Sequence, residues 1–231
     1  MLHIQGNRYL FIGASDTGKS WECMQFAEWF RNRKNSPKST VIFEHERNDE
    51  TYGNVEKYGI IKEISLNDLD YALKQKSAFR IISKDVETFI QKASRMVNTF
   101  FVIDDATGLF GSNVPKYVLD FLGLRKNSRL EIALQIHTIA ETAPLLFRNT
   151  DIWVIKQTGD SLPVKSSCPN SANVTKLLIE CQNENAKKDF KPMWATRLYI
   201  PNENKVYRKN LSKPWGISYP KQPVNIIINP L

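Results

Sequence analysis

The sequence has few cysteines and no long apolar segment. Its 231 residues include only Cys23, Cys168 and Cys181, which form no Cys-x-x-Cys pair and no zinc-binding pattern with the three histidines. We therefore expect a reducing, intracellular setting in which the cysteines act as ordinary apolar residues. No apolar run approaches the 18 residues of a membrane-spanning helix, and no signal peptide is recognisable. Internal repeats, heptads and low-complexity tracts are also absent.

The length and charge that are present narrow the class of protein. A chain of 231 residues suits one domain with a small appendage and is long enough to bury a substantial core. The formal net charge of +8 favours a polyanionic partner without identifying it.

The strongest motif is Gly-Ala-Ser-Asp-Thr-Gly-Lys-Ser at residues 13–20, which follows an apolar run and precedes a helical pattern. Strand, glycine-rich loop and helix are the context of a loop that binds the phosphates of a nucleotide through backbone N–H groups. Lys19 is placed to reach the β- and γ-phosphates of ATP, and the Ser20 hydroxyl to bind Mg²⁺. The residues expected to contact the nucleotide are Gly13, Ala14, Ser15, Asp16, Thr17, Gly18, Lys19, Ser20 and Trp21.

Apolar strand-like runs alternate with helical patterns as far as residue 157. We expect strands at 9–12, 40–43, 78–83, 99–103, 132–136 and 152–156, and helices at 21–33, 66–76, 86–97, 114–122 and 140–147. This alternation predicts an α/β fold with a mostly parallel central sheet flanked by helices. We take residues 1–157 as the core and residues 158–231 as an appendage packed on the same domain.

A second motif is the run Thr-Phe-Phe-Val-Ile-Asp-Asp at residues 99–105. Four consecutive apolar residues are typical of a parallel strand that is buried on both faces. The carboxylates that follow it stand where open α/β sheets bind their ligands. We expect Asp104 to hold the Mg²⁺ shell and Asp105 to orient or deprotonate the attacking water.

Polar residues near the later strands complete the candidate site. Gln135 and His137 end the strand at 132–136, where either side chain is a candidate sensor of the γ-phosphate. Arg125, Arg129 and Arg148 are expected to flank the same edge, and one of them could stabilise transition-state charge in a neighbouring subunit.

The chain resembles the FtsK–HerA superfamily of DNA-pumping ATPases in four features. They are the phosphate loop, the acidic strand, the strand ending in Gln135 and His137, and the segment Pro-Leu-Leu-Phe-Arg-Asn-Thr-Asp-Ile at 144–152. The small size resembles the genome-packaging ATPases of tailless icosahedral viruses and phages, with the Zot-like assembly ATPases as close relatives. The resemblance covers about residues 6–157. It implies a RecA-like core with one strand between the phosphate-loop strand and the acidic strand. The superfamily's second acidic residue is Glu, whereas this chain has Asp105.

The same resemblance implies a homo-oligomeric ring, an arginine supplied between subunits, a capsid or vertex protein as partner, and a location in the host cytoplasm or in the virion.

The last third of the chain has a different character. We expect a long loop at 158–173, a helix at 174–186 and a hairpin formed by 197–200 and 205–207. From residue 187 onward there are nine basic residues against two acidic ones, with aromatic residues between them. Such a segment suits sequence-independent contacts with the DNA backbone. The residues expected to make these contacts are Lys187, Lys188, Lys205, Arg208 and Lys209. The final residues 223–231 are apolar enough to dock as an edge strand on another chain.

Four functions remain open at this point. The first is a DNA-packaging motor driven by ATP hydrolysis, and the second is a Zot-like assembly or export ATPase. The third is a small-molecule kinase built on the same loop. The fourth is a nucleotide-gated assembly or DNA-binding switch with negligible turnover.

Overall fold

The computed structural model describes residues 6–32, 38–72, 75, 77–111, 113–124, 128–187 and 195–208. These residues form one nine-stranded sheet in the order β3-β4-β2-β5-β6-β1-β7-β8-β9. The strands are β1 (Arg8–Ile12), β2 (Ser39–Glu44), β3 (Lys62–Glu63), β4 (Ala78–Ile82), β5 (Thr99–Ile103), β6 (Glu131–Ile136), β7 (Ile152–Ile155), β8 (Arg197–Ile200) and β9 (Lys205–Arg208).

Strands β1 to β7 are parallel to one another, and β8 and β9 continue the same sheet beside β7 as antiparallel strands. The central strands are buried along almost their whole length, which explains why they read as continuous apolar runs rather than alternating ones. This confirms the α/β fold with a mostly parallel sheet.

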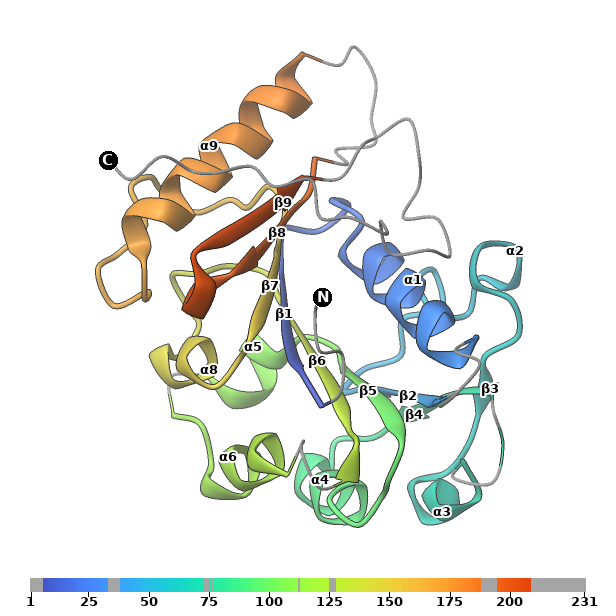
Figure 1. Cartoon of the computed structure of the whole chain (residues 1–231). Coiled ribbons are helices and arrows are strands. Elements are labelled where there is room, and N and C mark those ends of the chain that lie inside the picture. Colours follow the sequence, from blue (N-terminus) through green and yellow to red (C-terminus); the bar gives the residue numbers. More distant parts are fainter. Residues whose placement is uncertain are drawn as a thin grey trace.

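Helices cover both faces of the sheet, and Figure 1 shows α1 on one side and α5, α6 and α8 on the other. The helices are α1 (Lys19–Arg31), α2 (Val55–Tyr58), α3 (Leu69–Ala72), α4 (Val86–Ala93), α5 (Ala106–Phe110), α6 (Lys116–Gly123), α8 (Pro144–Arg148) and α9 (Ser171–Ala186), with 3₁₀ turns at Leu66–Asp68 and Pro201–Glu203. Each face has its own apolar cluster. One joins α1 to β1 and β5, and the other joins α4, α6, α8 and α9 to the opposite face.

The strand order places β6 directly between β1 and β5. The phosphate-loop strand and the acidic strand are therefore separated by one strand, as the resemblance implies. Because all three strands are parallel, their carboxyl ends meet at one edge of the sheet. The loops that follow β1, β5 and β6 consequently converge there.

Several expected helices are shorter in the structure. The helix expected at 86–97 ends at Ala93, and the one expected at 140–147 begins only at Pro144. Three short elements, α2, α5 and β3, were not expected, because segments of two to five residues carry too little periodicity to be recognised. The long loop and the hairpin of the last third are confirmed. The expected edge strand at 223–231 lies outside the described residues.

Candidate nucleotide-binding site

The loop between β1 and α1 has the backbone conformation of an anion-binding nest. Asp16 and Gly18 both adopt positive φ, at 60° and 77°, and Gly18 caps the N-terminus of α1. Successive N–H groups in such a loop point toward one centre, and the helix N-terminus adds a partial positive charge. A Cβ atom at Gly13 would lie 2.6 Å from Thr17 Oγ1, so this position also requires glycine for packing.

Lys19 extends from this loop into the site, where its side chain is only 6% exposed. Its ammonium group donates to the Ala14 carbonyl and to His137 Nδ1, both at 3.3 Å. Burial lowers the pKa of Lys19 to about 8, and the nearby carboxylates of Asp104 and Asp105 oppose that shift. Burial and the Lys19 ammonium also lower the pKa of His137. A neutral His137 at neutral pH is the form that accepts a hydrogen bond from a lysine.

The two carboxylates after β5 have different surroundings. Burial raises the pKa of Asp104 to about 6, and the Lys19 ammonium limits that rise. Asp105 is exposed and adopts φ 43°, and its carboxylate caps α5 by accepting from the Gly108 N–H at 3.1 Å. Asp104 therefore faces the phosphate loop, whereas the Asp105 carboxylate is held by its own helix.

Ser20, Gln135 and Tyr52 form a hydrogen-bonded chain behind the loop. The Ser20 hydroxyl donates to Gln135 Oε1 at 3.2 Å, and Gln135 Nε2 donates to the Tyr52 hydroxyl at 2.6 Å. Gln135 is fully buried and Tyr52 is 1% exposed. The structure thus brings both predicted strand-end residues to the site, with Gln135 bonded to Ser20 and His137 bonded to Lys19.

Ser20 and Asp104 fit a magnesium site at the phosphate loop. Both offer oxygen ligands, and Mg²⁺ in nucleotide sites takes one or two protein ligands, with phosphate oxygens and waters as the rest. A buried carboxylate with a raised pKa is also stabilised by a nearby cation. Among the described residues, no group of three or more His, Cys, Asp and Glu side chains could hold a metal ion. Ser20 and Asp104 would therefore hold Mg²⁺ together with the phosphate oxygens of a bound nucleotide.

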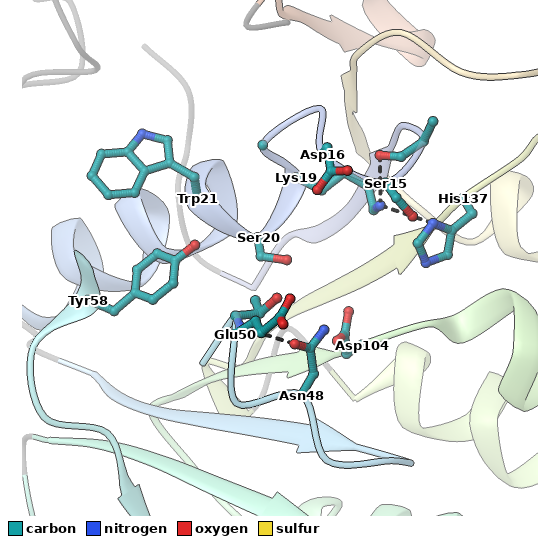
Figure 2. A pocket seen from close by; sticks show the side chains of 13 residues that line it. Ser15, Asp16, Lys19, Ser20, Trp21, Asn48, Glu50, Tyr58, Asp104 and His137 are labelled. Carbon is teal, nitrogen blue, oxygen red and sulfur yellow. Dashed lines mark hydrogen bonds between the residues drawn. The ribbon is translucent and has the colours of Figure 1, made fainter. Parts of the chain in front are cut away.

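These residues line a cavity of about 390 Å³, which also includes Asn48, Glu50 and Thr51 from the loop after β2. Figure 2 shows Asp104 and His137 on one side of Ser20, and Trp21 and Tyr58 on the other. A second cavity of about 460 Å³ is lined by Asp104, Asp105 and His137, among others. Asp104 and His137 line both cavities, so the acidic strand end lies between the phosphate loop and a further solvent-filled space.

The loop after β2 is fixed by a buried ion pair. Glu44 accepts two hydrogen bonds from Arg80, at 2.8 and 2.9 Å, and Arg80 also bonds Asp49 at 2.8 Å. The sequence did not lead us to expect that this loop lines the site, and it did not point to Tyr52 or Tyr58. Their only signal was an aromatic content unusual for a polar loop.

Lys156 was also missed as part of the site. It is 1% exposed and lies behind the loop, where its ammonium donates to Thr196 Oγ1 at 2.8 Å and lies 3.6 Å from Glu22 Oε1. Its Cβ would be 3.0 Å from a Cβ at Gly13. A lysine that ends an otherwise apolar strand was the available signal.

The expected placement of Arg129 and Arg148 is wrong. Arg129 precedes the amino end of β6 and Arg148 precedes the amino end of β7, whereas the phosphate loop lies at the carboxyl ends of these strands. Both arginines are exposed, but at the opposite edge of the sheet. Each arginine is close in sequence to the start of a strand, and the starts of these parallel strands lie at the edge opposite the phosphate loop. Arg125 lies outside the described residues.

The residues expected to contact DNA are only partly described. Lys187 is exposed at the end of α9, and Lys205 is exposed at the start of β9, where it pairs with Glu203 at 2.6 Å. Arg208 ends β9, whereas Lys188 and Lys209 lie outside the described residues. Arg197, which adds to the positive charge of this segment, is buried and paired with Glu180 and Glu184.

The parallel sheet, the helices on both faces and the phosphate loop at the carboxyl ends of the strands define the fold of a P-loop nucleoside triphosphatase. No protein-family description and no curated protein matches the sequence. None of the described helices has the length and apolar character needed to cross a membrane.

Solved structures of viral genome-packaging proteins share this fold. The chain is similar to the genome packaging NTPase B204 from Sulfolobus turreted icosahedral virus 2 in complex with ATP-gammaS, with a TM-score of 0.63 and 14% identity over 89% of this chain and 97% of that one. The AMP complex of the same protein gives a TM-score of 0.62 at 16% identity, covering 88% and 96% of the two chains. B204 of Sulfolobus Turreted Icosahedral Virus, named a DNA-packaging ATPase, gives 0.58 at 14% identity, covering 90% and 98%.

Proposed function

We propose that this chain is a Mg²⁺-dependent ATPase that acts as a homo-oligomeric ring and moves DNA during the packaging of a viral or phage genome. The observation that carries the proposal is the convergence of the nest at residues 13–20 with Asp104 across a single intervening strand. The named function of the similar structures, genome packaging, supports the choice of DNA as the cargo.

In this proposal the loop N–H groups and Lys19 bind the β- and γ-phosphates, and Ser20 and Asp104 hold Mg²⁺. The metal supplies charge neutralisation at the phosphates when it is bound. Gln135 keeps the Ser20 hydroxyl oriented through their hydrogen bond, and His137 orients the Lys19 ammonium. Asp105 orients or deprotonates the attacking water, since accepting the Gly108 N–H at Oδ1 leaves its carboxylate with further acceptor sites.

The contacts with DNA are proposed for the basic part of the appendage, from Lys187 onward. It carries most of the net charge of the chain, and its described members Lys187 and Lys205 are exposed. Contacts of this kind neutralise phosphates and read no sequence. The capsid or vertex protein remains the proposed docking partner of the ring.

The test compares ATP hydrolysis with and without DNA for the wild type and for Lys19→Ala. We expect DNA-stimulated hydrolysis in the wild type and its loss in Lys19→Ala. The matched control is Lys62→Ala, which removes an exposed lysine from β3 and should keep wild-type turnover. Native mass measured on the same samples reports the ring. Turnover in Lys19→Ala equal to that of the control would refute the assignment of the site.

One observation favours a second candidate, a nucleotide-gated switch with negligible turnover. The Asp105 carboxylate caps α5 and lines the second cavity, but Asp105 is not among the residues that line the phosphate-loop cavity. Asp105→Asn separates the two readings. A motor that uses this carboxylate should bind ATP normally and lose about 10²–10⁴-fold in hydrolysis, whereas a switch should show single-turnover behaviour, no stimulation by DNA and no effect of the substitution.

A further inference from the structure

Three aromatic side chains form a row beside the phosphate loop. The rings of Trp21 and Tyr58 have centroids 5.9 Å apart and an interplanar angle of 40°, and those of Tyr58 and Tyr52 are 6.4 Å apart at 35°. Trp21 is on α1 directly after Ser20, whereas Tyr58 ends α2. Tyr52 is buried and bonded to Gln135, so it anchors the row. Trp21 and Tyr58 are only half-buried.

The two half-buried rings line the cavity that contains the phosphate loop. In Figure 2 these two rings lie on one side of Ser20, and Asp104 and His137 lie on the other. The cavity therefore has a charged end and an aromatic end. Tyr58 also lines a neighbouring cavity of about 370 Å³ together with Met24, Gln25 and Glu28 of α1. Its ring therefore stands between two open spaces rather than inside the core.

We propose that Tyr58, supported by Trp21, is the surface on which the base of the bound nucleotide stacks. The inference rests on the proposed function, since a triphosphate must first occupy the nest. With its phosphates at the nest and its γ-phosphate toward Asp104, the nucleotide has its base at the opposite end of the cavity. An aromatic face is the chemistry that binds a planar base.

The polar side chains around this end set the expected selectivity. Asn48, Glu50 and Thr51 line the same cavity, and all come from the loop after β2. Asn48 Oδ1 accepts from the backbone N–H of Thr51 at 3.0 Å, so this oxygen is engaged within the loop. Stacking reads the face of a base and tolerates its identity. The expected ligand class is therefore nucleoside triphosphates without strong selectivity for the base, with ATP and GTP bound within a few-fold of each other.

The experiment compares two probes that share the phosphates but differ in the base, namely ATP and inorganic tripolyphosphate. Their dissociation constants are measured by calorimetry with Mg²⁺ for the wild type, Tyr58→Ala and Tyr58→Phe. Tyr58→Ala should weaken ATP by about 5- to 100-fold, the range for one base–aromatic stack, and should leave tripolyphosphate unchanged. Tyr58→Phe keeps the ring and should bind ATP within about twofold of the wild type.

Matched controls and a second variant guard against misfolding. Trp21→Leu should weaken ATP in the same selective way, whereas Trp29→Leu should not, because Trp29 is a half-buried tryptophan of the same helix that packs on Phe30. Equal weakening of ATP and tripolyphosphate, or no weakening of ATP in Tyr58→Ala, would overturn the base subsite. Failure of the wild type to bind either probe would instead overturn the proposed function.

Discussion

The hydrogen-bonded chain from Ser20 through Gln135 to Tyr52 gives a sharp test of the site's construction. Gln135 is fully buried, accepts from the Ser20 hydroxyl and donates to the Tyr52 phenol. Gln135→Leu keeps the approximate volume of the side chain and removes both bonds. Leaving buried polar groups without their partner costs about 1–3 kcal/mol. We expect the free energy of unfolding to fall by about that amount.

The second half of the test is Tyr52→Phe, alone and combined with Gln135→Leu. Tyr52→Phe alone leaves the buried Gln135 amide without its acceptor and should also cost about 1–3 kcal/mol. The double variant leaves neither the amide nor the phenol unpaired. Its loss of stability should therefore be smaller than the sum of the two single losses, with a coupling energy of about 0.5–3 kcal/mol.

Urea unfolding of the four proteins measures the coupling, and ATP turnover on the same samples shows whether the chain also orients Ser20. The control is Thr40→Val, because the Thr40 hydroxyl is buried and has no hydrogen-bond partner among the residues that the structure describes. Its removal should be neutral or stabilising. Losses for Gln135→Leu and Tyr52→Phe that add within about 0.5 kcal/mol would show that the two side chains do not depend on each other.

Three further predictions concern the rest of the molecule. Glu131→Ala leaves the buried Lys38 ammonium without its carboxylate, at the edge of the sheet opposite the nest. It should lower the free energy of unfolding by about 3–5 kcal/mol and leave tripolyphosphate binding unchanged. A loss of binding free energy as large as the loss of stability would contradict this prediction. Burial raises the pKa of Cys168 to about 12 and of Cys181 to about 11, so at pH 8 roughly one thiol in a thousand or fewer is ionised, and iodoacetamide should label them only after unfolding. Because folding suppresses this ionisation, stability should fall as the pH rises above about 8.5, where unfolded thiols ionise; a flat profile there would argue against it. If the basic residues from Lys187 onward bind the DNA backbone, the logarithm of the DNA-binding constant should fall with the logarithm of salt concentration, with a slope of about −0.9 per phosphate contacted. A binding constant that does not change with salt would exclude these contacts.

The sequence was most informative where one residue type is needed for a local reason. The glycines of the nest and the four apolar residues before Asp104 are required by backbone geometry and by burial on both faces of a strand, so the strand–loop–helix and the acidic strand end could be predicted. Tyr52 and Tyr58 could not be predicted. They reach the site because Glu44, Arg80 and Asp49 fix the loop after β2, and those contacts join residues about 30 positions apart. The role of Asp105 as a helix cap was hidden for a related reason, since α5 is too short to show periodicity.

The arginines show how topology changes a functional argument. Arg129 stands before the first residue of β6, and the nest meets the last, so the two are separated by the length of a six-residue strand. At about 3.3 Å per residue this is roughly 20 Å, which an arginine side chain cannot span. Arg148 likewise stands before β7, whose four residues span about 13 Å. Neither arginine can therefore reach the triphosphate held by its own chain. If either one contributes to hydrolysis, it must act on a second copy whose nest faces this edge. A catalytic role for Arg129 or Arg148 therefore requires the proposed oligomer, whereas the oligomer does not require that role.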